Sequence, residues 1–196
     1  MKTFVVFCMK LVLLLVHISG NDHLVNAAAT SHNTSSYNTE QEALLALKTH
    51  ITYDPYNSLA SNWSSTTPVC SWIVVSCDPI LHRVTYLNLS DMGLQGTIPP
   101  HIASLSFLAV IDLSDNSFHG SLPSELASLR LLKRINLVRN NFTGAIPNIL
   151  SNMSSLQYVS LFGNKFTGSL PDDFFENLPN LQDLVLANNL LVGQIP

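Results

Sequence analysis

A six-residue phrase recurs along the second half of the chain at a nearly constant interval. It reads apolar residue, any residue, glycine, any residue, isoleucine or leucine, proline. The copies occupy residues 94–99, 118–123, 142–147, 166–171 and 191–196. Their glycines are 24, 24, 24 and 25 residues apart. A period of this length predicts a solenoid, in which each unit buries its apolar face only by stacking on its neighbours.

Each unit also begins with the pattern Leu-x-x-Leu-x-Leu, in which isoleucine or valine replaces some leucines. The patterns start at Val84, Leu108, Leu132, Leu156 and Leu181. Such alternation predicts a short strand whose x positions face outward. We therefore expect an α/β leucine-rich-repeat solenoid with a parallel concave sheet, convex helical or 3₁₀ turns and a helical N-terminal cap.

The length of 196 residues suits one such domain preceded by a leader. We expect a signal peptide over 1–29, a flexible segment over 30–38 and a cap with a disulfide over 39–83. The repeats are expected over 84–107, 108–131, 132–155, 156–180 and, incompletely, 181–196. The fourth repeat has one extra residue, which we expect in its convex turn.

An asparagine follows the last strand leucine of four repeats by three residues. These residues are Asn116, Asn140, Asn164 and Asn189, whereas Met92 holds the position in the first repeat. A buried asparagine at such a bend can bond backbone groups that the turn leaves unpaired. We expect an asparagine ladder that starts in the second repeat.

The first 29 residues have the order of a secretory signal. Lys2 precedes an apolar run from Phe4 to Ile18, and the small residues Ala27 to Ala29 follow. Lys10 interrupts the run, which disfavours a membrane span. The alternative is a buried N-terminal helix. Secretion would place the chain outside the cell.

The cap is expected to begin with a helix over about residues 40–51. Thr39 and Glu42 match a capping box, Ile51 closes the apolar face, and Asp54 with Pro55 ends the helix. This face is expected to cover the open end of the first repeat. The two tryptophans of residues 57–82 are expected to pack beneath it rather than form a ligand cage.

Two cysteines remain once Cys8 leaves with the leader. An even count in a secreted chain favours one disulfide between Cys70 and Cys77. The alternatives are two free thiols or two ligands of a metal site. A zinc site needs more ligands, and His82 is the one close candidate. We expect no metal and no cofactor.

Composition and motifs argue against several other classes. The net charge is −4 and no run of lysine or arginine occurs, so nucleic-acid binding is not expected. No hydrolase, metalloprotease or phosphate-loop motif is present, and the acidic pair Asp172 and Asp173 suits an exposed turn. We expect a binding protein and not an enzyme.

Five Asn-x-Ser/Thr sequences are glycan acceptors if the chain is secreted. They stand at Asn33, Asn62, Asn88, Asn141 and Asn152. Asn88 occupies an outward strand position of the first repeat. A glycan there would be harder to attach, or would block that part of the concave side.

The outward positions of the third and fourth repeats carry two arginines and two aromatic residues, Arg134, Arg139, Tyr158 and Phe162. Exposed arginine and aromatic residues are frequent interface anchors, and arginine binds carboxylates bidentately. They form our candidate ligand patch. The alternative is ordinary solenoid surface, with Arg139 paired to Asp115 one repeat away.

The cap motifs complete the pattern. Residues 42–48 read Glu-Ala-Leu-Leu-Ala-Leu-Lys, residues 70–77 enclose Trp72 between Cys70 and Cys77, and residues 83–89 read Arg-Val-Thr-Tyr-Leu-Asn-Leu. With the repeats, residues 39–196 resemble the N-terminal part of the ectodomain of plant leucine-rich-repeat receptor-like serine/threonine kinases. Val74 stands where that family has glycine, which is expected to strain the loop.

The resemblance implies extracellular recognition, in defence or developmental signalling, of a peptide, a microbial pattern or a co-receptor. The chain would then lie in the apoplast, or at the plasma membrane as part of a longer receptor. The family's membrane span and kinase domain are not in this sequence, so we expect a fragment of a receptor, poorly stable because its last repeat is uncapped. Two alternatives remain: a secreted inhibitor of a cell-wall-degrading enzyme, and a nonfunctional truncated product.

Overall fold

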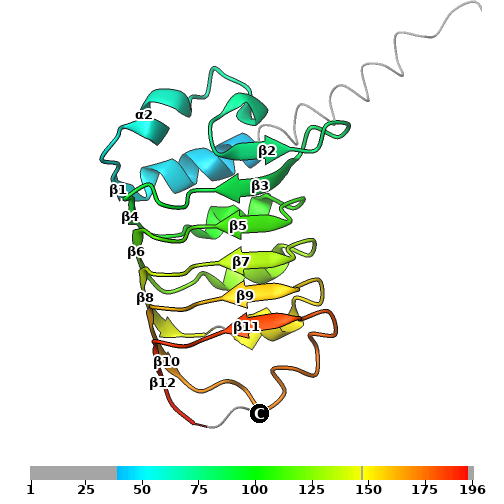
Figure 1. Cartoon of the computed structure of the whole chain (residues 1–196). Helices are drawn as coiled ribbons and strands as arrows, with labels where there is room; N and C mark the ends of the chain where they lie inside the picture. The colour runs from blue at the N-terminus through cyan, green and yellow to red at the C-terminus, as the bar shows by residue number, and fades with distance from the viewer. Residues whose placement is uncertain (1–38, 147, 194–196) are drawn as a thin grey trace, which may run out of the picture.

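The repeats stack into a solenoid with a parallel sheet along one side (Figure 1). The computed structural model describes residues 39–146 and 148–193, so the expected leader and the segment 30–38 lie outside the described residues. The concave strands are β3 (Val84–Asn88), β5 (Val110–Asp112), β7 (Arg134–Asn136), β9 (Tyr158–Ser160) and β11 (Asp183–Val185). They are parallel and adjacent in chain order, which confirms the predicted sheet. β2 (Val75–Cys77) adds an antiparallel strand beside β3.

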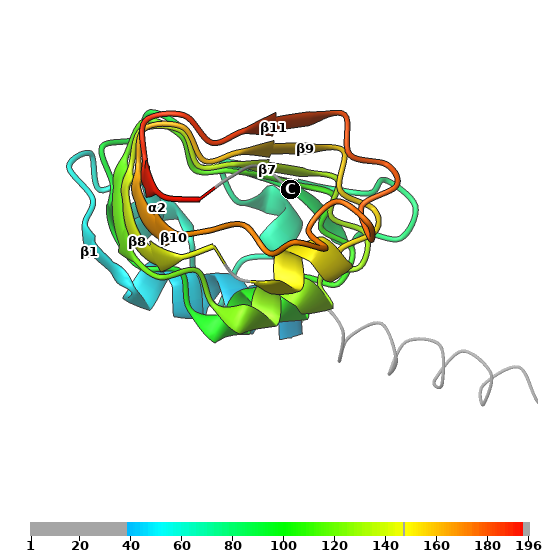
Figure 2. The same cartoon turned by 90° about the horizontal axis from the view of Figure 1, so that it is seen from below.

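A second sheet, which the sequence did not lead us to expect, runs along one flank (Figures 1 and 2). Its strands are β1 (Ile51–Tyr53), β4 (Gln95–Gly96), β6 (Ser117–Gly120), β8 (Asn141–Ala145), β10 (Lys165–Gly168) and β12 (Leu190–Leu191). The strands β4, β6, β8 and β10 contain the glycine of the recurring phrase, and β12 ends two residues before it. β1 pairs antiparallel with β4. A side chain at Gly96 would collide with the carbonyl oxygen of His50, so this junction requires glycine.

The convex side of the first three repeats carries short 3₁₀ helices, as predicted. They are η2 (Pro100–Ser104), η3 (Ser124–Ser128) and η4 (Asn148–Asn152). Figure 2 shows them on the side opposite the concave sheet, in line with the helix over residues 39–49. In the fourth repeat, residues 172–177 form turns instead. Its extra residue leaves the strands in register, because Asp183 still pairs with Tyr158.

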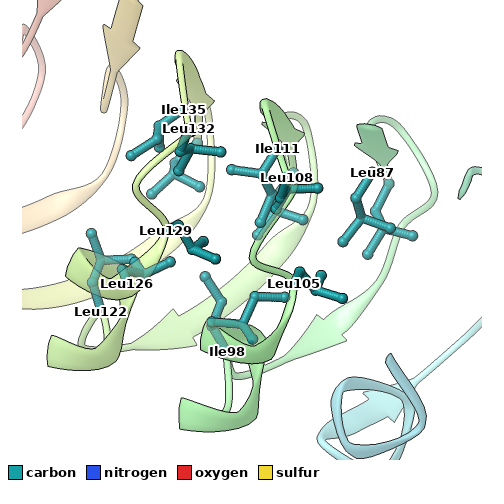
Figure 3. Packing of buried hydrophobic residues seen from close by; sticks show 14 of the residues in the cluster. Leu87, Ile98, Leu105, Leu108, Ile111, Leu122, Leu126, Leu129, Leu132 and Ile135 are labelled. Carbon is teal, nitrogen blue, oxygen red and sulfur yellow. The ribbon is translucent and has the colours of Figure 1, made fainter. Parts of the chain in front are cut away.

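Equivalent apolar side chains of successive repeats fill the interior in columns. Figure 3 shows Leu108 beside Leu132 and Ile111 beside Ile135, and all four are buried. A separate column of phenylalanines lies behind the flank sheet. Phe118, Phe142 and Phe166 are fully buried, and their rings stack with centroids 6.2 and 6.1 Å apart. Each repeat therefore offers its neighbour a surface of the same shape.

The cap differs from expectation at both ends of its first helix. Thr39 is already helical, so it is not the N-cap. The helix ends at residue 49, and Ile51 begins β1 instead of closing the helical face. Asp54 caps the next helix, α2 (Ser58–Asn62), because its carboxylate accepts the backbone N–H groups of Ser58 and Leu59. A carboxylate at a helix start satisfies amides that lack a partner within the helix.

Beneath this helix the two tryptophans stack on each other. The ring centroids of Trp63 and Trp72 are 5.2 Å apart, and both side chains are buried. Their indole N–H groups donate to the carbonyl oxygens of Ile73 and Thr67. Both rings are thus part of the cap core. A disulfide joins Cys70, in η1 (Val69–Ser71), to Cys77 at the end of β2.

Candidate functional site on the concave surface

The register of the concave sheet places the outward residues of successive repeats side by side. One row reads Tyr86, Val110, Arg134, Tyr158 and Asp183. Stacked repeats give such rows a common orientation, while the core beneath them stays the same. These surface positions can therefore carry side chains of different chemistry without a change in the fold.

Arg134 and Tyr158 of the candidate patch are in direct contact. The guanidinium carbon of Arg134 lies 4.3 Å from the centroid of the Tyr158 ring. Within the described residues, no hydrogen bond or ion pair engages this guanidinium. A cation over an aromatic face is attracted by the ring quadrupole, and its N–H edge remains available. The pair presents oriented donors to solvent.

Arg139 is engaged differently. Its guanidinium lies 2.9 Å from the carboxylate of Asp115, with both side chains well exposed. Arg134 begins β7, whereas Arg139 lies three residues beyond the end of that strand. Phe162 is half-buried beside Arg139 and accepts its backbone N–H. The four residues of the patch thus form two pairs at opposite ends of the strands.

The turn after each concave strand has a left-handed residue. Its φ is 55° at Asp91, 56° at Asp115, 49° at Arg139, 70° at Gly163 and 56° at Asn188. Aspartate, asparagine and glycine tolerate this conformation, whereas arginine seldom adopts it. Arg139 of the candidate ligand patch belongs to this column. The Asp115–Arg139 ion pair therefore joins two adjacent turns of the solenoid.

A second set of polar side chains runs across the middle of the concave face. The side chains of Asn88 and Asp112 accept the backbone N–H of Ser90 and Ser114, respectively. Asn136 donates to Asp112 over 2.8 Å. Asn88 is half-buried and holds the first repeat's turn. This middle zone is bonded within itself, so the unengaged donors lie at the Arg134 end.

The asparagines behind the strand ends bond to two repeats at once. Asn140 accepts the N–H of Phe118 over 2.9 Å and donates to the carbonyl oxygen of Leu113 over 2.8 Å, both in the preceding repeat. It also donates to Leu137 of its own repeat. Equivalent bonds are made by Asn116, Asn164 and Asn189. The ladder fixes the spacing at which the concave rows are presented.

Other parts of the described chain provide weaker candidates for a functional site. Across residues 39–146 and 148–193, no group of three or more His, Cys, Asp or Glu could hold a metal. An apolar hollow of about 230 Å³ beside the disulfide is lined by Gln41, Pro68, Val69, Cys70 and His82. At the nearby β2–β3 turn, the backbone N–H groups of Leu81 and Ile80 lower the pKa of Asp78. These hydrogen bonds shape the turn and do not form a reactive site.

The chain matches two family models that together cover most of the described region. The first is the leucine rich repeat N-terminal domain, over residues 37–78. The second is the leucine rich repeat, matched four times over residues 83–105, 107–129, 131–153 and 155–177. The chain therefore belongs to the leucine-rich-repeat proteins with a plant receptor-type N-terminal cap.

Similar proteins from Arabidopsis thaliana are plant receptors and an inhibitor. The LRR receptor-like serine/threonine-protein kinase EFR is 36% identical over 76 residues, which are 39% of this chain and 7% of that protein. Polygalacturonase inhibitor 2 is 37% identical over 71 residues, 35% of this chain and 21% of that protein. The chain thus spans a small fraction of the length of these relatives.

Solved structures of receptor ectodomains share the fold. The BIR2 ectodomain is 34% identical with a TM-score of 0.73, covering 80% of this chain and 83% of that one. The receptor kinase HAESA, in complex with the peptide hormone IDA and the co-receptor SERK1, is 28% identical with a TM-score of 0.63, covering 79% of this chain and 30% of that one. The matched region is the non-catalytic part of such receptors.

Among the described helices, none is long and apolar enough to cross a membrane.

Proposed function

We propose that this chain recognises an extracellular peptide or protein surface through its concave side, as the N-terminal part of a receptor-kinase-type ectodomain. The observation that carries the proposal is the Arg134–Tyr158 pair, which offers oriented donors on a sheet whose other polar groups are largely bonded among themselves. Interface anchors of this kind are typical of recognition surfaces. The similarity to ectodomains that bind a peptide hormone and a co-receptor supports it.

The proposal includes export through the secretory pathway. The apolar run after Lys2 and the small residues at 27–29 support cleavage near Ala29. The relatives are membrane receptors or extracellular proteins. A reading frame that continues into a membrane span and a kinase domain would attach this ectodomain to the plasma membrane.

The test uses the full chain, expressed in plant cells with a C-terminal tag and recovered from the apoplastic fluid. Fractionated apoplastic peptides are passed over the immobilised protein, and retained species are identified by mass spectrometry. We expect retention of a peptide that Tyr158→Ala abolishes and Thr167→Ala, on the flank strand β10, preserves. Retention lost only in the flank variant would refute concave recognition.

The inhibitor alternative rests on the similarity to polygalacturonase inhibitor 2. It predicts that the secreted chain lowers the rate of a fungal polygalacturonase in a reducing-sugar assay. The downstream genomic sequence separates the remaining possibilities. A frame that continues into a span and a kinase domain supports the receptor, whereas an in-frame stop after a few more repeats supports the inhibitor.

A further inference from the structure

Two opposite charges lie in the same row of the concave sheet, two strands apart. Arg134 on β7 and Asp183 on β11 both pair in register with Tyr158 on the intervening strand β9. Both side chains are exposed. Neighbouring strands are about 4.8 Å apart, so the two side chains start about 10 Å from each other. Tyr158 stands between them in the row, and the Arg134 guanidinium lies over its ring.

Neither charge is neutralised by the protein. Over the described part of the chain, the two ion pairs are Arg83 with Glu40 and Arg139 with Asp115. Arg134 contacts an aromatic ring instead of an acid, and Asp183 makes no side-chain hydrogen bond among the described residues. The contrast with Arg139 is direct, because Arg139 lies in the turn that follows the same strand and has its acidic partner one repeat away. The Arg134 row is therefore a dipolar surface with both ends available.

We infer that this row binds an extended peptide that crosses the strands, with a carboxylate at Arg134 and a cationic side chain at Asp183. The inference deepens the proposed function and rests on it. In the polyproline II conformation, three residues make one turn and advance about 3.1 Å each. Charged residues at positions i and i+3 then project from the same side, about 9 Å apart. That spacing matches the row, and a proline or similar residue between them would lie over Tyr158.

The probe is the peptide acetyl-Pro-Glu-Pro-Pro-Lys-Pro-amide, which already favours the polyproline II conformation. Its comparators are acetyl-Pro-Glu-Pro-Lys-Pro-amide, with the charges one residue closer, and a peptide with glutamine at both charged positions. Binding to the secreted full-length chain is measured by NMR titration of the peptide resonances. We expect the i+3 peptide to bind at least about three-fold more tightly than either comparator, the scale of one exposed charge pair. High salt should reduce the difference.

Variants make the test specific to the row. Arg134→Gln and Asp183→Asn should each remove the preference for the i+3 peptide, whereas Lys165→Gln, a charge change on the flank strand β10, should retain it. Arg134→Glu creates two acids and should favour acetyl-Pro-Lys-Pro-Pro-Lys-Pro-amide. A reversed preference cannot arise from misfolding. Equal affinity for the three original peptides, or an unchanged preference in Arg134→Glu, would overturn the inference.

A natural apoplastic peptide provides a separate outcome. If one is retained through Tyr158 but its affinity is the same for the wild-type chain and Arg134→Glu, the charge row is not the site, and concave recognition still stands. If no concave variant affects retention, the proposed function itself fails. The two failures are therefore distinguishable.

Discussion

The carboxylate of Glu40 links the N-terminal helix to the first repeat through Arg83. One carboxylate oxygen lies 2.8 Å from the guanidinium of Arg83, and the other accepts the backbone N–H of Val84 over 3.1 Å. Glu40 is fully buried, whereas the Arg83 side chain is 17% exposed and lies over the Phe107 ring. Cap and solenoid are thus joined by a polar contact inside an otherwise apolar interface.

Glu40→Gln should weaken this junction because it leaves the Arg83 guanidinium and a buried amide poorly matched. Removing one partner of a buried pair costs about 3–5 kcal/mol, and the partial exposure of Arg83 reduces the expected loss to about 2–3 kcal/mol. Urea unfolding of the secreted protein measures it. Glu42→Gln, exposed on the same helix, is the matched control. Equal effects of the two changes would show that the buried contact contributes nothing.

Val74→Gly should stabilise the cap. Val74 has a φ of 62°, a left-handed conformation that a β-branched residue rarely adopts. The substitution relieves this strain, but glycine also has greater freedom in the unfolded chain. Together the two effects should raise the free energy of unfolding by about 0.5–1 kcal/mol. Val75→Gly, in the buried strand β2, should instead lower the melting temperature. Destabilisation by Val74→Gly would mean that the packing of the side chain outweighs the strain.

Asn140→Ala should be among the most damaging single changes in the repeats. It leaves the N–H of Phe118 and the carbonyl oxygen of Leu113 without their ladder partner in the interior. Unsatisfied buried polar groups cost about 1–3 kcal/mol each, so we expect a loss of about 3–5 kcal/mol in denaturant unfolding. The control is Asn180→Ala, an exposed residue with one bond to Ser154. A loss below about 1 kcal/mol at Asn140 would contradict the ladder's role.

Loss of the Cys70–Cys77 disulfide should lower stability by about 2–3 kcal/mol, the chain-entropy cost for so short a loop. Thermal unfolding should show this loss of stability both for Cys77→Ser and for the native protein after mild reduction. Intact mass with and without reductant, after alkylation, reports the bond itself. Two alkylatable thiols in the unreduced secreted protein would disprove the pairing in solution.

Glycan occupancy should be uneven among the five acceptor sequences. Asn152 is exposed and is expected to be well used, as are Asn33, Asn62 and Asn141. Asn88 differs from these sites because it lies on the concave strand β3, where its side chain is bonded to Ser90, so its glycan would compete with the turn of the first repeat. Glycopeptide mapping after secretion decides it. Full occupancy at Asn88 would contradict this reading of the concave side.

The concave architecture was predictable because its signals repeat. Strand leucines, the ladder asparagines and the convex turns each recur with the same period, and a period survives local irregularities. The flank sheet was not predictable, since strands such as Gln95–Gly96 are too short to show alternation and contain the glycine that marks turns elsewhere. The predicted boundaries of the first cap helix were wrong for a similar reason. Asp54 and Pro55 indicate a helix end, but cannot reveal that β1 intervenes and that Asp54 caps the next helix.

The candidate site was predicted in composition and not in geometry. The rows follow from the period, so Arg134 beside Tyr158 was expected. The alternative reading of the sequence, with Arg139 paired to Asp115 one repeat away, is the arrangement that the structure shows for this arginine. The sequence could not show that Arg139 adopts a left-handed turn, since arginine has no preference for that conformation. Nor could it show that Glu40, and not Glu42, is the carboxylate that matters in the cap. Both depend on contacts between residues distant in the sequence.

The asparagine ladder also bears on how such a gene can change length. Each ladder residue bonds the preceding repeat at the same two places, so any repeat that carries the asparagine can follow any other without losing a partner. Unequal recombination that adds or removes one whole repeat restores every bond at the new junction, whereas a shift of a few residues breaks all of them. Lineages can therefore lengthen or shorten this protein in steps of one repeat, and each step brings a new row of concave side chains under selection.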